Sequence, residues 1–270
     1  MSADNDQTEA LKARFVASRG YWDSASDALL ELDRGFFKTA VQLAEVPGNS
    51  DLLSPKIKAL LRLAFDVAIT HLDVSAVEQD IANALQLGAS SAEVLEVCHL
   101  TSVLGIHSCT VGVPMLAEEL RALGREDEMG ALEFDARRDS LKQAFIAKRG
   151  YWSPLWDDLL RHSPDYFEAY SAFSAYPWTE GVLEPKVKEF VYIAIDAATH
   201  HLFEPGLRIH IRNALGHGAS GAEIMTVLQL LTIEGMRSSA MGARVLRDQL
   251  GAPGASRALD ALGALGTSTT

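Results

Sequence analysis

Cysteine and basic residues are both scarce in this sequence of 270 residues. It has two cysteines, Cys98 and Cys109, and 24 lysines and arginines against 36 aspartates and glutamates, which gives a formal net charge of −12 at pH 7. Within one continuous helix the two cysteines would lie about 16 Å apart, too far for a disulfide, so we expect a reducing, cytoplasmic environment. The acidic balance opposes contact with phosphate backbones, so we expect no nucleic-acid partner.

The sequence also lacks a long apolar run and an N-terminal targeting signal. Its longest nearly apolar run, residues 190–198, is interrupted by Asp196 and is much shorter than a membrane span. The first seven residues are acidic and polar, unlike a secretory signal. We therefore expect no membrane partner. What the chain does have is 48% hydrophobic residues, enough to bury one large core or two modest ones.

An internal repeat is the main organising feature of the chain. The sequence aligns with itself, without a gap over most of its length, when Arg19 is placed on Arg149. The clearest matches pair residues 19–22 with 149–152, 55–58 with 185–188, and 81–93 with 211–223. They predict two tandem domains, residues 1–130 (the first copy) and 131–250 (the second copy). Residues 251–270 are rich in alanine, glycine, serine and threonine, so we expect a flexible tail there.

Each copy has the sequence pattern of a helical domain. Apolar residues recur at intervals of three and four, as at Leu207 and Ile211, and no alternating pattern typical of strands occurs. Gly218 stands where a helix would end, and Ser220 with Glu223 forms the capping-box pattern that begins the next helix. The same signals occur at the matching positions of the first copy. We therefore predict an all-α protein.

One histidine and one glutamate of the second copy are candidates for chemistry. His210 falls on the apolar face of the helix expected at 205–215, where a buried imidazole needs a partner. Glu189, near the start of the preceding expected helix, is its natural partner. The first copy has Asp80 and Ala59 at these positions, which favours one competent site and one degenerate site. The alternatives are a satisfied core histidine and a surface glutamate beside lysines.

These residues lie in segments that resemble a known family. The segment from His210 to Ile224, with the lead-in Pro185-Lys186-Val187-Lys188 before Glu189, resembles the signature of the carboxymuconolactone decarboxylase family, which includes the alkylhydroperoxidase D-like proteins. The resemblance covers about two-fifths of each copy. It implies two tandem helical domains of this family and an active site containing Glu189 and His210. Because single-domain relatives form trimers and hexamers, it also implies a homo-oligomer, with a trimer favoured.

The sequence departs from the redox branch of that family. That branch has a Cys-x-x-Cys motif ending four residues before the histidine, where this chain has Phe203 and Gly206. Without a thiolate, disulfide exchange and thiol peroxidase chemistry have no agent. The resemblance then implies the decarboxylase branch, whose substrate is an unsaturated lactone carrying a carboxylate. Its conjugated carbonyl accepts the electrons left by CO₂, so we expect no cofactor.

In that chemistry His210 would deliver a proton to carbon and Glu189 would orient it. Arg208 and Arg212 could clamp the substrate carboxylate, although helix arginines on a different face from His210 are usually solvated. His201 and Trp152 are further candidates to contact the substrate, with core packing or hydrogen bonding as their ordinary alternative.

The histidines also raise the question of a metal. His200, His201, His210 and His217 with Glu204 suggest zinc, but no two of these histidines have His-x-x-x-His spacing, so we predict no metal site. The favoured function is a cofactor-independent decarboxylase, or a related proton-transfer enzyme, acting on a small carboxylated lactone or keto acid. The alternatives are a lactone or enol hydrolase or isomerase with the same pair, a metal-dependent hydrolase, and a non-catalytic oligomeric binding or scaffold protein.

Overall fold

The computed structural model describes residues 2–130 and 133–251, which are helical and contain no strand. The all-α prediction is confirmed. The α-helices are α1 (Ser2–Arg19), α2 (Ser24–Leu32), α3 (Arg34–Gly48), α4 (Pro55–Val67), α5 (Val74–Gln86), α6 (Ser91–Ser102), α7 (His107–Ala122), α8 (Ala136–Arg149), α9 (Asp157–His162), α10 (Pro164–Thr179), α11 (Pro185–Ala197), α12 (Glu204–Gly216), α13 (Gly221–Ile233) and α14 (Met236–Gly251). Three short 3₁₀ helices join them, η1 (Val103–Ile106), η2 (Glu126–Met129) and η3 (Pro154–Trp156). The expected tail lies, from residue 252 on, outside the described residues.

The two sequence copies fold alike at the level of single helices. Helices α4 and α11 begin and end at matching positions of the repeat, and so do α5 and α12. Leu72 and Leu202 take the same left-handed backbone, with φ of 50° in both. Thr70 Oγ1 hydrogen-bonds to His200 Nδ1 at 2.7 Å, so equivalent positions of the two copies meet, as happens near a twofold axis. The division into domains at Gly130 stays a prediction.

By contacts, the chain forms two compact units. Unit 1 combines the residues up to Ala59 with those from Ser220 on, and unit 2 is Leu60–Ala219. In unit 1, α14 packs on α2, and α3 packs on α1 and α13. Its core gathers around Phe15, Phe37 and Val41. Each unit therefore draws helices from both sequence copies.

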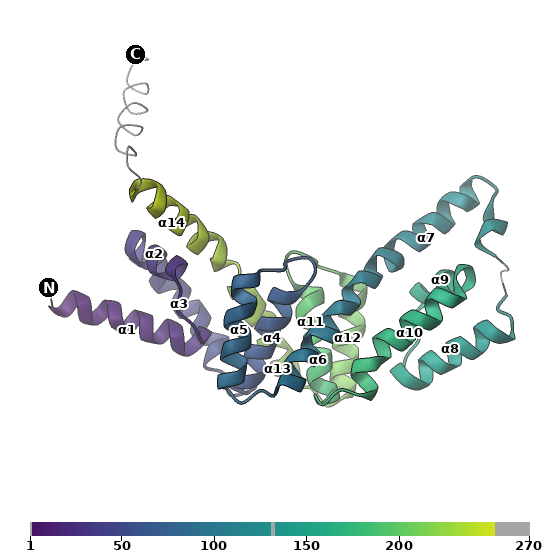
Figure 1. Cartoon of the computed structure of the whole chain (residues 1–270), viewed down its shortest axis with the longest axis horizontal. Coiled ribbons are helices and arrows are strands. Elements are labelled where there is room, and N and C mark those ends of the chain that lie inside the picture. Colours follow the sequence, from purple (N-terminus) through teal and green to yellow (C-terminus); the bar gives the residue numbers. More distant parts are fainter. Residues whose placement is uncertain (1, 131–132, 252–270) are drawn as a thin grey trace, which may run out of the picture. The chain divides into compact units, whose positions relative to one another are not determined.

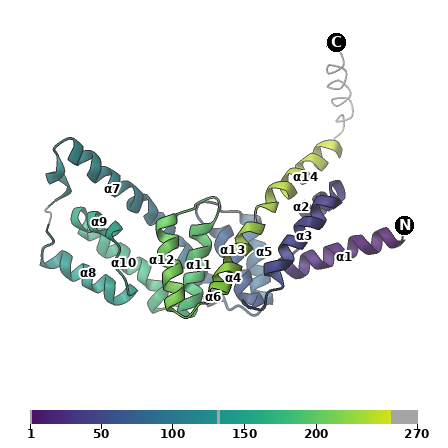
Figure 2. The same cartoon turned by 180° about the vertical axis from the view of Figure 1, so that it is seen from behind.

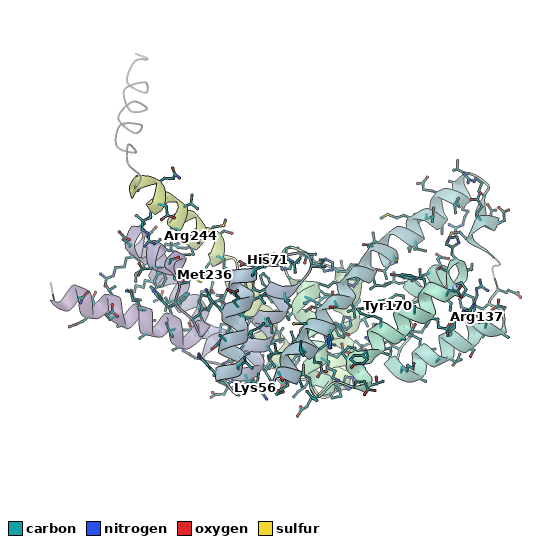
Figure 3. All side chains as sticks on the ribbon, viewed as in Figure 1. Lys56, His71, Arg137, Tyr170, Met236 and Arg244 are labelled. Carbon is teal, nitrogen blue, oxygen red and sulfur yellow. The ribbon has the colours of Figure 1, made fainter. Side chains whose placement is uncertain are left out.

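Unit 2 contains the candidate pair. Helix α11 packs against α12 and α6, and Figures 1 and 2 both show α11 and α12 side by side. Every residue of α11 from Val187 to Asp196 is buried, as expected for the central helix of a core. Helices α8, α9 and α10 pack together, with α7 against α9. Arg137 of α8 is exposed at the end of this group, where it pairs with acidic side chains of α10 (Figure 3).

One stretch passes a simple test for a membrane span. Ser91–Ala122 is long and apolar enough, with a mean hydropathy of 1.5, to cross a membrane by length and composition. The stretch consists of α6, η1 and α7, and Val97 and Leu100 of α6 are fully buried inside the protein. The core helix of a soluble protein passes the same test, so the stretch is weak evidence for a membrane protein.

Candidate active site

The structure brings the predicted glutamate and histidine into contact. His210 Nδ1 of α12 lies 2.6 Å from Glu189 Oε2 of α11, and Asn213 Nδ2, one turn further along α12, donates to Glu189 Oε1 at 3.2 Å. The side chain of Glu189 is 2% exposed and that of His210 is 12% exposed. The packing of α11 on α12 thus joins two side chains that lie on consecutive helices. A buried carboxylate bound to Nδ1 fixes the orientation of the ring and leaves Nε2 for a substrate.

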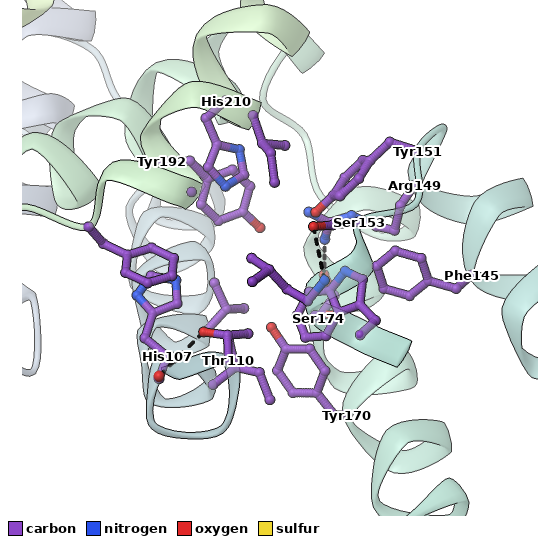
Figure 4. Close-up of a pocket in the computed structure, with 17 residues that line it drawn as sticks. His107, Thr110, Phe145, Arg149, Tyr151, Ser153, Tyr170, Ser174, Tyr192 and His210 are labelled. Carbon is purple, nitrogen blue, oxygen red and sulfur yellow. Dashed lines mark hydrogen bonds between the residues drawn. The ribbon is translucent and has the colours of Figure 1, made fainter. Parts of the chain in front are cut away.

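A pocket opens beside His210. The space between its lining atoms, part of which is open to solvent, is about 530 Å³. Its lining comes from α11 and α12, from η1 and α7 of the first copy, from α8 and α10, and from the turn and η3 that follow α8 (Figure 4). Polar groups in the lining include His210, Tyr192, His107, Arg149, Tyr151 and Tyr170. The pocket therefore offers several hydrogen-bonding groups around one imidazole.

Three tyrosines give the pocket neutral hydroxyl donors. Burial raises the pKa of Tyr151, Tyr170 and Tyr192, so all three keep their protons at neutral pH. The ring of Tyr192 stacks on His210, with the ring centroids 4.4 Å apart. Hydroxyl donors in a partly enclosed pocket are suited to bind an oxyanion that forms during a reaction.

Arg149, at the end of α8, is a pocket residue that the sequence analysis missed. Its Nη1 donates to the carbonyl oxygen of Ser174 at 2.9 Å, and its guanidinium lies over the rings of Trp178, Tyr192 and Tyr151 at 5.0 to 6.0 Å. Within the part of the chain that the structure describes, it has no carboxylate partner. The internal repeat could have identified it, because Arg149 aligns with Arg19 in the matched segment 149–152.

A pair of histidines, His107 and His201, lies at the edge of the pocket. His107 Nδ1 and His201 Nε2 are 2.6 Å apart, with the rings inclined by 6°, and His107 Nε2 lies 4.0 Å from Asp196 Oδ1. Burial lowers the pKa of His107 to about 3 and raises that of Asp196 to about 7. Neither His107 nor Asp196 was among the candidate site residues of the sequence.

This trio also has the composition of a metal site. Its donor atoms lie within 4.8 Å of one another. However, two ring nitrogens about 2.0 Å from a tetrahedral metal ion lie roughly 3.3 Å apart. Here they are 2.6 Å apart, a hydrogen-bond distance. As placed, the two rings form a hydrogen bond rather than two arms of a metal site.

The four residues predicted to bind substrate lie outside the lining of the pocket. Arg208 is exposed and pairs with Glu204 at 2.7 Å, and Arg212 is exposed as well. Trp152 packs in the aromatic core of unit 2, and His201 contacts His107 and Phe203, two residues that line the pocket. The arginines therefore match the solvated alternative, and a role in binding stays a prediction for all four.

The histidines considered together for zinc do not converge. They have separate neighbours: Thr70 for His200, His107 for His201, Glu189 for His210 and Trp178 for His217. No zinc site of the kind suggested by the sequence is therefore assembled from these four histidines.

Gly206 occupies one of the two cysteine positions of the redox branch. A Cβ atom here would collide with Asp196 Oδ2 and would lie 2.7 Å from Cδ1 of Phe203, the residue at the other position. The carboxylate of Asp196 therefore fills the space that a cysteine side chain would need.

Comparisons with known proteins point to one family. A model of the carboxymuconolactone decarboxylase family matches residues 164–248, which include both Glu189 and His210. A crystal structure from Burkholderia xenovorans, provisionally described as a gamma-carboxymuconolactone decarboxylase subunit, is 41% identical with a TM-score of 0.86. The match covers 90% of this chain and 97% of that chain. A search of curated proteins gave no significant match.

Proposed function

The chain belongs to the carboxymuconolactone decarboxylase family, and we propose that it is a cofactor-independent decarboxylase of a small carboxylated lactone or keto acid. The observation that carries the proposal is the 2.6 Å hydrogen bond between buried Glu189 and the pocket residue His210. The family and the similar crystal structure support a decarboxylase-like role. The identity of the acid–base pair and of the substrate class is our proposal.

Decarboxylation needs a proton donor and a group that accepts the electron pair of the broken bond. When the bond to the carboxylate breaks, CO₂ leaves and the electron pair passes into the conjugated carbonyl as an enolate. Protonated His210 then donates its Nε2 proton to carbon, which balances the step, while Glu189 stabilises the charged ring beforehand. The neutral hydroxyl of Tyr192 is positioned in the same pocket to donate to the enolate oxygen.

The first copy lacks this pair. Ala59 replaces the glutamate, and Asp80, in place of the histidine, lies 3.8 Å from Arg62. We assign activity to the second copy alone. The similar crystal structure is described as a subunit, which supports a homo-oligomer, and we propose a trimer in the cytoplasm.

The test compares wild type with His210→Gln and Glu189→Gln on gamma-carboxymuconolactone and a panel of β-keto acids. Released CO₂ and product mass are measured, and circular dichroism verifies folding. We expect kcat to fall by about 10²-fold or more in both variants. His217→Ala, at an exposed position after α12, is the matched control and keeps wild-type turnover. Product without CO₂ would replace decarboxylation by hydrolysis or isomerisation, and unchanged turnover in both variants would place the site elsewhere.

A further inference from the structure

Both sequence copies place an arginine at the end of their first helix. Arg19 ends α1 and Arg149 ends α8, and the two arginines occupy matching positions of the repeat. In each case a glycine with positive φ follows, 86° at Gly20 and 75° at Gly150, and its N–H closes the helix. The two arginine side chains therefore start from matching positions, on helices that end in the same way.

In unit 1, Arg19 of the first copy binds a carboxylate that the second copy supplies. Arg19 Nη1 donates to Glu234 Oε1 at 2.6 Å and Nη2 donates to Oε2 at 2.7 Å, so two parallel hydrogen bonds join the groups. Both side chains are only 2% exposed. This two-pronged geometry is the arrangement in which a guanidinium recognises a carboxylate most specifically.

In unit 2 the arginine, Arg149, remains but the matching carboxylate is missing. The position equivalent to Glu234 is Leu104, which is buried. Half-buried Arg149 lies among aromatic rings, and its hydrogen-bond partners, the Ser174 carbonyl oxygen and the hydroxyls of Tyr192 and Tyr151, carry no charge. A partly buried cation without a counter-ion is unfavourable, and this one lines the pocket that contains His210.

We propose that Arg149 binds a carboxylate of the ligand, in the role that Glu234 plays for Arg19 within unit 1. The ligand class is a carboxylate on a flat unsaturated or aromatic body, because the rings of Tyr192 and Tyr151 lie beside the guanidinium. Carboxylate binding stands on the geometry alone, whereas its part in turnover rests on the proposed function.

For a decarboxylase, the chemistry also decides which carboxylate Arg149 holds. An ion pair with the departing carboxylate would stabilise the bound substrate and weaken as neutral CO₂ forms, which would slow the reaction. Arg149 therefore holds the carboxylate that the product retains. The substrate then carries two carboxylates, and the product remains a ligand of the same arginine.

The test is equilibrium binding, which needs no turnover. Isothermal titration calorimetry compares benzoate with its neutral isostere benzamide. Wild type is expected to prefer benzoate by about 10-fold or more, the strength of a modest charged hydrogen-bond pair. Arg149→Met should abolish this preference. Leu104→Glu, which places a glutamate at the position equivalent to Glu234, should abolish it as well while keeping Arg149. Arg121→Met, an exposed arginine of α7, is the matched control and keeps the preference.

Two results would overturn the inference. One is no preference for benzoate in wild type, and the other is a preference that survives Arg149→Met. If Arg208→Met loses the preference for benzoate and Arg149→Met keeps it, the carboxylate is bound by α12. Failure of the proposed function is distinguishable, because a wild-type protein that prefers benzoate but releases no CO₂ from the lactone panel would retain the Arg149 site.

Discussion

The Arg19–Glu234 pair makes a quantitative prediction about the stability of unit 1. Glu234→Leu introduces at position 234 the leucine that stands at the equivalent position 104. It removes both hydrogen bonds, at 2.6 and 2.7 Å, and leaves Arg19 charged at a site where its side chain is 2% exposed. Removing one partner of a buried ion pair costs about 3–5 kcal/mol, since the other charge stays desolvated. At about 2–4 °C per kcal/mol for a protein of this size, Tm should fall by about 6–20 °C.

The assay is urea denaturation with differential scanning calorimetry at pH 7, on Glu234→Leu and on the double variant Arg19→Met/Glu234→Leu. The double variant removes both charges and keeps the volume apolar, so it should lie within about 1.5 kcal/mol of wild type. A loss below about 1 kcal/mol in the single variant would show that Arg19 reaches water or another partner. A double variant as unstable as the single one would show that packing, and not the unpaired charge, carries the cost.

Three further predictions concern the surroundings of the pocket. Gly206→Ala should destabilise the protein by about 1–3 kcal/mol because its Cβ collides with Asp196, whereas Gly216→Ala in the same helix meets no atom within 4 Å and should be neutral or stabilising in thermal melts. Burial raises the pKa of Asp196 from 3.8 to about 7, so its contribution to stability is complete below pH 4 and is lost as pH rises through 7. Asp196→Asn should flatten this pH dependence by about 4 kcal/mol between pH 4 and pH 8, and a constant difference from wild type in urea melts would contradict the assignment. Finally, replacing Cys98 and Cys109 by serine should leave turnover unchanged, and any peroxide-dependent activity lost with them would revive the redox alternative.

The sequence predicted the local features of the site well. Helical spacing and the capping-box pattern at Ser220 and Glu223 led to helices that the structure contains, with both capping hydrogen bonds formed. The contrast between the two copies identified Glu189 and His210 as the unusual pair, and the structure places them in contact. These features depend on residues near one another in the chain, or on direct comparison of the copies.

The rest of the pocket depends on which helices pack together. His107 comes from α7 of the first copy, whereas Arg149 comes from α8 of the second, and both line one pocket with His210. Periodicity reports which face of a helix is buried but not which helix covers it. For that reason the sequence pointed to Arg208, which is near His210 in the chain, and not to Arg149, which is near it in space.

The two copies show how one fold can lose or keep a ligand site by exchanging partners. Two arginines of the first copy find counter-charges within the chain, Arg19 with Glu234 of the second copy and Arg62 with Asp80. In the second copy the arginine at the position of Arg19 keeps no such counter-charge among the described residues. A partly buried charge without a counter-charge lowers the stability of the fold, so an arginine left in this state inside a pocket is the group that a bound carboxylate would pair with. Leu104→Glu should therefore convert unit 2 toward unit 1, with the fold intact by circular dichroism and carboxylate binding lost.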